Sequence, residues 1–79
     1  MEKEVNEITL TLTNDEALVL FDFLSRFNEK EHNELFEDQS EEKTLRLIES
    51  QLEKILVEPF MPNYIDILKE ARNKTRNKE

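Results

Sequence analysis

The chain contains no glycine, and this absence excludes two common kinds of nucleotide site. The P-loop and the dinucleotide-binding fingerprint both need glycine where the backbone approaches a phosphate. Glycine is also the usual residue where a helix ends or a tight hairpin turns. Helices in this protein must therefore end at proline or at asparagine.

Cysteine is absent as well, which excludes a disulfide and a thiolate metal site and fits a reducing compartment. The longest apolar run covers only residues 17–21, which is too short to cross a membrane. Residues 1–7 are charged and lack the apolar core of a signal peptide. We therefore expect a cytoplasmic protein that does not enter a membrane.

Basic side chains are outnumbered by acidic ones, 11 to 19, and the net charge is −8. Residues 1–70 hold 18 of the acidic and 7 of the basic side chains, whereas residues 71–79 hold 4 basic and 1 acidic. An acidic body repels phosphates, so no nucleic-acid partner is expected. Solubility is the simpler explanation of the charge, and attraction of a basic protein partner is the alternative.

The length of 79 residues suffices for one small domain, which we place at residues 1–72. Chains this short bury a small share of their surface and often depend on association with another chain. Residues 73–79 contain no apolar side chain and are predicted to form a disordered basic tail.

Residues 5–13 show the pattern of a half-buried β-strand. Ile8, Leu10 and Leu12 alternate with threonines, which gives an apolar side chain at every second position. The chain offers no second clear strand, although the backbone of a strand needs a neighbour for its hydrogen bonds. We therefore expect this strand to pair with its copy across a two-fold axis, forming a homodimer.

A helix is predicted directly after this strand, at residues 14–28. Thr13 and Glu16 have the spacing of a capping box. Eight of the eleven residues from 17 to 27 are apolar, and most of them fill one face of the helix. Leu18 and Val19 lie beyond the edges of that face. The predicted interface therefore consists of Ile8, Leu10, Leu12, Leu18 and Val19.

An acidic connector at residues 29–42, which could be a loop or a helical turn, precedes a second predicted helix. Asp38 or Ser40 can cap this helix, which reaches Val57 and carries an apolar stripe along residues 45–56. Pro59 ends it and begins a proline elbow at residues 58–64.

A third helix is predicted at residues 64–73, with Asn63 as its cap. The predicted fold class is therefore mainly α: an N-terminal β-strand followed by three helices, with the proline elbow between helices 2 and 3.

Motifs that would carry chemistry are sparse. Glu29 and His32 have the Glu-x-x-His spacing of carboxylate-bridged di-metal bundles, and Glu49 and Glu53 could add carboxylates in a dimer. One short copy of this motif arises readily by chance in so acidic a chain. We therefore assign no catalytic residue, no cofactor and no metal ligand, and a metal-dependent enzyme formed in a dimer is the weaker alternative.

Three stretches together resemble a known group of proteins: residues 15–27, residues 52–60 with the sequence LEKILVEPF, and residues 68–72 with the sequence LKEAR. Over residues 10–72 the chain is similar to a group of short bacterial hypothetical proteins of unknown function. The resemblance implies a bacterial source and brings no activity, ligand or site residue.

The function expected from the sequence is that of a small acidic, non-catalytic protein-interaction module, acting as a regulator or an accessory protein. The alternative in the same class is an inhibitor, either immunity-like or antitoxin-like, or a nucleic-acid mimic that binds a basic partner. Both hypotheses rest on the acidic charge and on the unpaired apolar segment at residues 8–12.

Overall fold

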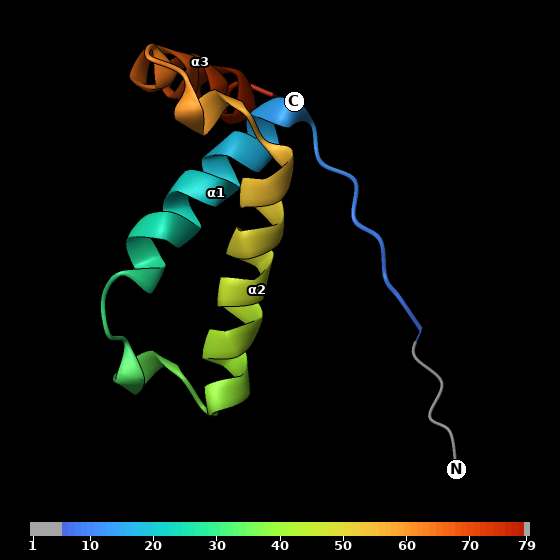
Figure 1. The fold of residues 1–79 in the computed structure, drawn as a ribbon, viewed down its shortest axis with the longest axis vertical. Helices are drawn as coiled ribbons and strands as arrows, with labels where there is room; N and C mark the ends of the chain where they lie inside the picture. Colours follow the sequence, from blue (N-terminus) through green and yellow to red (C-terminus); the bar gives the residue numbers. More distant parts are fainter. Residues whose placement is uncertain (1–5, 79) are drawn as a thin grey trace.

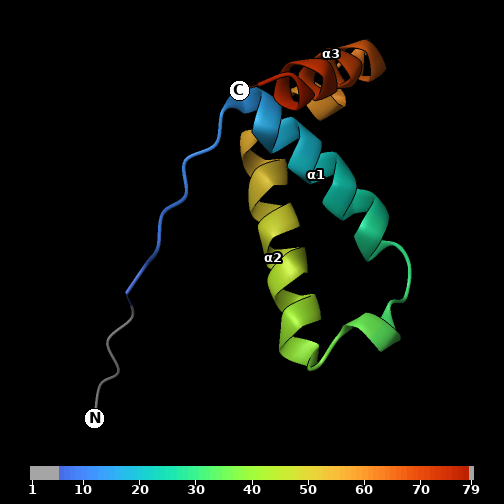
Figure 2. The same ribbon diagram turned by 180° about the vertical axis from the view of Figure 1, so that it is seen from behind.

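Helices make up the body of the protein in the computed structural model, which describes residues 6–78. The elements in chain order are α1 (Asn14–Asn28), the 3-10 turn η1 (Asn33–Leu35), α2 (Gln39–Ile55), the 3-10 turn η2 (Glu58–Phe60) and α3 (Tyr64–Arg76). α1 and α2 form an antiparallel hairpin, and α3 lies across the end where α1 begins and α2 finishes (Figure 1). The view from behind shows the same arrangement (Figure 2).

The prediction of an N-terminal strand is wrong for the described residues. Residues 6–13 form no strand, and they extend away from the helical body as an arm (Figures 1 and 2). A strand needs a neighbouring strand to receive its backbone hydrogen bonds. The rest of the described chain is helix and turn, so it offers none. The fold is mainly α with three helices, and the predicted start at Val5 lies outside the described residues.

The predicted start and end of α1 are confirmed. The hydroxyl of Thr13 accepts a hydrogen bond from the Glu16 backbone N–H at 3.1 Å, and the Glu16 carboxylate accepts one from the Thr13 N–H at 2.9 Å. This reciprocal pair satisfies two backbone donors that the first turn leaves free. The cap also marks the point where the N-terminal arm, residues 6–13, joins the body.

The ends of α2 and α3 differ in part from the prediction. Asp38 caps α2 by accepting from the Ser40 N–H at 2.8 Å, as expected, but α2 ends at Ile55 before the proline elbow. Asn63 stands at the cap position of α3 without a side-chain capping bond. α3 continues to Arg76, three residues beyond its predicted end at residue 73, so helix replaces part of the expected disordered tail.

The core lies where the three helices meet. Leu18 is the largest fully buried side chain, at 1% exposed, and it packs in one cluster with Ala17, Leu56, Leu68 and Ala71. The sequence placed Leu18 at the margin of the apolar face of α1. Its burial follows from α3, which covers a second side of the helix that the sequence pattern alone did not reveal.

The connector between α1 and α2 is a turn with the short helix η1, which answers the question left open by the sequence. Phe36 holds this connector to α1 by an edge-to-face contact with Phe27, at 6.1 Å between ring centroids. Leu35, in contrast, is exposed. Only one of the two apolar residues of the connector therefore anchors it.

Candidate interaction surface

A shallow groove of about 280 Å³ opens where the N-terminal arm leaves the body, between the arm and the C-terminal end of α2. None of the described residues lining it is charged, although 38% of the chain is Asp, Glu, Lys or Arg. We call it the arm groove. The residues lining the arm groove are Leu10, Leu12, Thr13, Asn14, Ala17, Leu52, Ile55 and Leu56.

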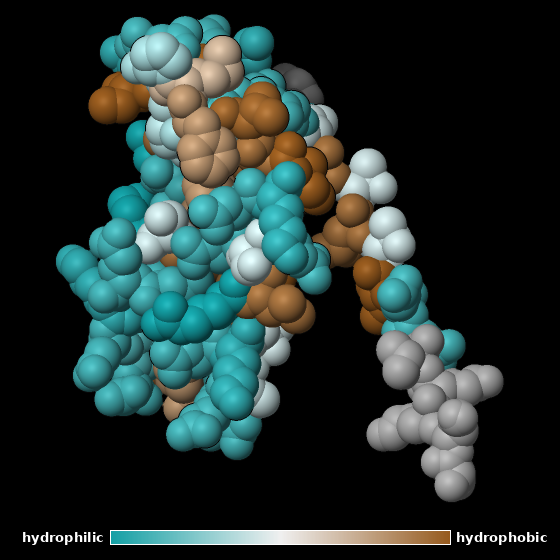
Figure 3. Space-filling view, viewed as in Figure 1, coloured by the Kyte–Doolittle hydropathy of each residue, from teal (hydrophilic) through white to brown (hydrophobic). Residues whose placement is uncertain are grey.

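Large apolar side chains are exposed along both walls of the arm groove. On the arm, Ile8 is 88% and Leu10 is 82% exposed, and on α2, Ile55 is 73% exposed. Val57 and Phe60, which follow α2, are also exposed. Figure 3 shows hydrophobic residues gathered where the arm meets the body and along the arm itself. Clustered apolar side chains of this kind are a candidate surface for binding another molecule.

Polar contacts hold the rim of the arm groove in place. The Asn14 side chain donates to the Glu58 carboxylate at 3.0 Å, which ties the start of α1 to η2. Lys78 forms an ion pair with Glu16 at 2.7 Å, so the basic C-terminal end neutralises acid at the start of α1. Asn14 belongs to the lining of the groove, whereas Glu16, Glu58 and Lys78 do not, and these contacts leave the apolar walls uncovered.

Hydrogen bonds lower the pKa of two carboxyl groups at this rim. The pKa of Glu16 is lowered mainly by the hydrogen bond from Lys78 and next by the bond from the Thr13 backbone N–H. The pKa of Glu58 is lowered mainly by the hydrogen bond from its own backbone N–H and next by the bond from the Asn14 side chain. A lowered pKa in the folded state means that the ionised form stabilises the fold. This contribution is fully present above the ordinary Glu pKa of 4.5 and disappears as the pH falls through the lowered value.

We therefore expect the wild type to be more stable than Glu16→Gln at neutral pH, and the difference to shrink below pH 4.5 and to vanish as the pH falls through the lowered pKa of Glu16. Urea unfolding of both proteins over a pH series measures this. Glu34→Gln, the same substitution at an exposed position outside the rim, is the matched control. A difference between the wild type and Glu16→Gln that stays constant into acid would contradict the prediction.

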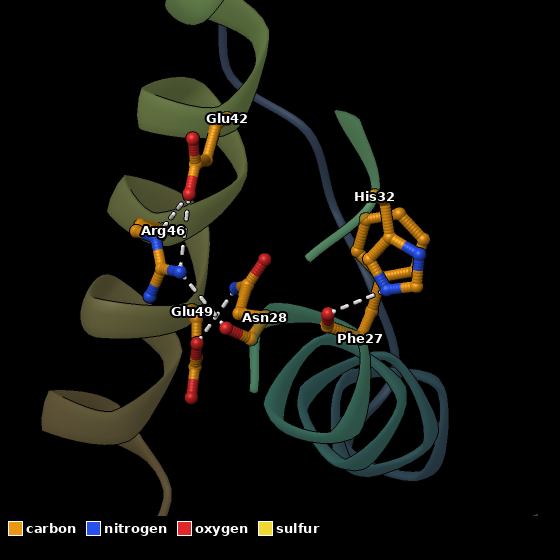
Figure 4. Close-up of polar contacts among 6 residues, drawn as sticks. All are labelled: Phe27, Asn28, His32, Glu42, Arg46 and Glu49. Carbon is orange, nitrogen blue, oxygen red and sulfur yellow. Dashed lines mark hydrogen bonds and ion pairs between the residues drawn. The ribbon is translucent and has the colours of Figure 1, made fainter. Parts of the chain in front are cut away.

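A second polar cluster closes the other end of α1 without glycine (Figure 4). Arg46 donates to the backbone carbonyl of Asn28 at 2.8 Å, and His32 donates through Nε2 to the carbonyl of Phe27 at 2.9 Å. The buried Asn28 side chain donates to the Glu49 carboxylate at 2.7 Å. Carbonyls at the end of a helix lack partners within it. Here side chains from α2 and from the connector supply them.

The same cluster accounts for the residues weighed as metal ligands. The His32 ring stacks on Phe27 at 3.9 Å between centroids, and Glu49 accepts the hydrogen bond from Asn28. Glu29 and Glu53 are exposed. Within residues 6–78, no group of three or more His, Asp or Glu side chains is placed to hold a metal ion. A metal site shared between two chains stays an untested prediction.

The five residues of the predicted interface fall into two groups. Ile8 and Leu10 are exposed on the arm, and Leu12 stands at its base with 42% exposure. Leu18 is buried and Val19 is partly buried against the core, so neither belongs to the free surface. The sequence analysis did not identify Ile55 as an interface residue. Ile55 lies at one edge of the apolar stripe of α2, and this edge position was the only feature of the sequence that could have indicated its exposure.

The structure defines a small, mainly α-helical protein with an exposed apolar arm. Comparison with protein-family models, with curated proteins and with solved structures gave no match. No helix in the described part of the chain combines the length and apolarity needed to cross a bilayer.

Proposed function

We propose that this protein is a non-catalytic protein-interaction module of the cytoplasm, which regulates or assists a partner that binds at the arm groove. The observation that carries the proposal is the uncharged lining of the groove, flanked by exposed Ile8, Leu10 and Ile55. Fully burying one such side chain contributes about 1.5–3 kcal/mol. Three of them therefore supply a substantial driving force for association.

A second candidate function rests on a different surface, the acidic connector between α1 and α2. Glu29, Glu31, Glu34 and Glu37 are exposed there, and Glu41 is exposed in the adjoining first turn of α2. Such a surface suits a basic protein, and the role would be that of an immunity-like or antitoxin-like inhibitor or of a nucleic-acid mimic. Electrostatic association of this kind is weakened by salt, whereas apolar binding is not.

Affinity capture from a native lysate of the source cells tests both functions. The wild type is compared with Ile55→Glu, which places a charge in the arm groove. Ile65→Glu is the matched control, because Ile65 is 78% exposed on α3 and does not line the groove. We expect one partner to be retained by the wild type and by Ile65→Glu and to be lost from Ile55→Glu.

The salt dependence separates the two candidates. Retention that survives about 500 mM salt but not Ile55→Glu supports binding at the arm groove. Retention that is unaffected by Ile55→Glu and lost at about 500 mM salt supports the acidic surface instead. If no protein is retained at low salt and the chain does not associate with itself, the proposal of an interaction module is wrong.

A further inference from the structure

We infer that the N-terminal arm of one copy occupies the arm groove of a second copy, and that the exchange is reciprocal. This inference rests on the proposed function, because it names the partner that binds at the same surface. It requires no strand in the isolated chain. It requires only that the exposed apolar residues of the arm enter the groove of another molecule.

The chemical match between the arm and the groove favours a second copy over a basic protein. Residues 8–14 carry no charge, and neither do the described residues that line the groove. The carboxylates of this protein that could bind a basic partner lie elsewhere on its surface. An uncharged apolar segment is the occupant that such a lining suits, because burying an unpaired charge there would be costly. Residues 8–13 of the arm are a segment of this kind.

The arm also has the shape that the groove requires. In an extended chain, alternate side chains point to opposite sides, so Ile8, Leu10 and Leu12 share one side and the threonines the other. Residues 6–13 can span roughly 26 Å when extended. The 17 residues of α2 span roughly the same length. The extended arm of one molecule is therefore long enough to cross the groove of another, whose α2 wall is formed by Leu52, Ile55 and Leu56.

The arm of a chain cannot fill the arm groove of the same chain, because it already forms one wall of that groove. Leu10 and Leu12 already form one wall of the groove in their own chain, opposite Leu52 and Ile55. The space between the two walls is open. If the arm of a second molecule fills this space, each arm forms a wall of the groove in its own chain and also occupies the groove of the other chain. Such a self-complementary contact closes as a two-fold dimer.

Sedimentation equilibrium of the full chain from about 1 to 200 µM tests for the dimer, because this range detects dimers with dissociation constants in the micromolar range. We expect the wild type and Ile65→Glu to dimerise. Ile55→Glu and Leu10→Glu should weaken the dimer by about tenfold or more. Because each chain carries a net charge of −8, dimerisation should become tighter with salt.

Disulfide cross-linking tests the arrangement, and the absence of cysteine makes single-cysteine variants unambiguous. Leu10→Cys protein carrying an isotope label is mixed with unlabelled Ile55→Cys protein and oxidised. We expect a labelled–unlabelled cross-linked pair, several times more abundant than with Ile65→Cys in place of Ile55→Cys. Each chain has one cysteine, so a cross-link must join two molecules.

Two results would overturn the inference. A monomer throughout the concentration range would exclude the second copy as occupant, and a dimer without the preferred pairing of residues 10 and 55 would exclude arm exchange. Neither result removes the interaction module, which fails only if capture from the lysate also fails. Circular dichroism of each variant checks that the helices remain formed.

Discussion

Leu18→Ala is expected to destabilise the protein by about 3 kcal/mol, the largest effect we predict. Leu18 is 1% exposed and fills the centre of the cluster formed by Leu56, Leu68 and Ala71. Truncation removes favourable burial and leaves a cavity among these side chains. Small domains have marginal stability, so this loss represents a large fraction of the total. Urea unfolding followed by circular dichroism measures it.

Leu47→Ala is the matched control, because the same atoms are removed from α2 at a position that is 57% exposed. A change within about 0.5 kcal/mol is expected there. The pair of variants also distinguishes a core role for Leu18 from the interface role that its place in the sequence favours. A small loss for Leu18→Ala at a concentration where the chain is monomeric would contradict the core role.

Asn28→Ala is expected to cost about 1–3 kcal/mol, the second largest effect. The Asn28 side chain is buried and gives a hydrogen bond to Glu49, and the variant leaves that half-buried carboxylate without its donor. The bond joins the end of α1 to the middle of α2, where few apolar contacts hold the hairpin: the structure places no fully buried residue within α2. Urea unfolding again provides the measurement.

A double-mutant cycle with Glu49→Ala isolates the contribution of the Asn28–Glu49 bond. We expect a coupling of about 1 kcal/mol between the two positions. Asn33→Ala removes the same side chain from an exposed position in η1 and should change stability little. Additive losses in the cycle would show that Asn28 acts through packing and not through its bond to Glu49.

The features predicted correctly depend on residues that are close in the chain. The capping box of Thr13 and Glu16 spans three residues, and the cap of α2, in which Asp38 accepts from the Ser40 N–H, spans two. These contacts form at the start of a single helix at fixed spacing. A pattern of residue types is therefore enough to identify them, and with them the approximate course of α1 and α2.

The predictions that failed depend on residues far apart in the chain. Alternation at Ile8, Leu10 and Leu12 is compatible with a strand, but a strand forms only where another strand is available, and the described chain is helical. A helical-wheel projection of the α1 sequence shows one apolar face, whereas in the structure α2 and α3 cover this helix from two sides. This second contact buries Leu18 and leaves Phe23, at one edge of the predicted face, 48% exposed.

For the candidate site, the sequence identified the apolar residues of the arm but not the wall opposite them. Ile55 belongs to the same apolar stripe as Leu52 and Leu56, and only the packing of the helices shows which of them stays uncovered. The same holds for Asn28 and Arg46, whose bond joins positions 18 residues apart. No local pattern encodes such a pairing.

The sequence by itself determined the approximate course of the helices, the caps at Thr13 and Asp38, the proline elbow and the acidic charge, because each follows from composition or from contacts within a turn or two of helix. It also excluded glycine-dependent nucleotide sites and thiolate chemistry. Only the tertiary structure decided that residues 6–13 extend as an arm, that Leu18 lies in the core and that Ile55 lines an open groove. These depend on how three helices cover one another, which is set by packing between distant segments.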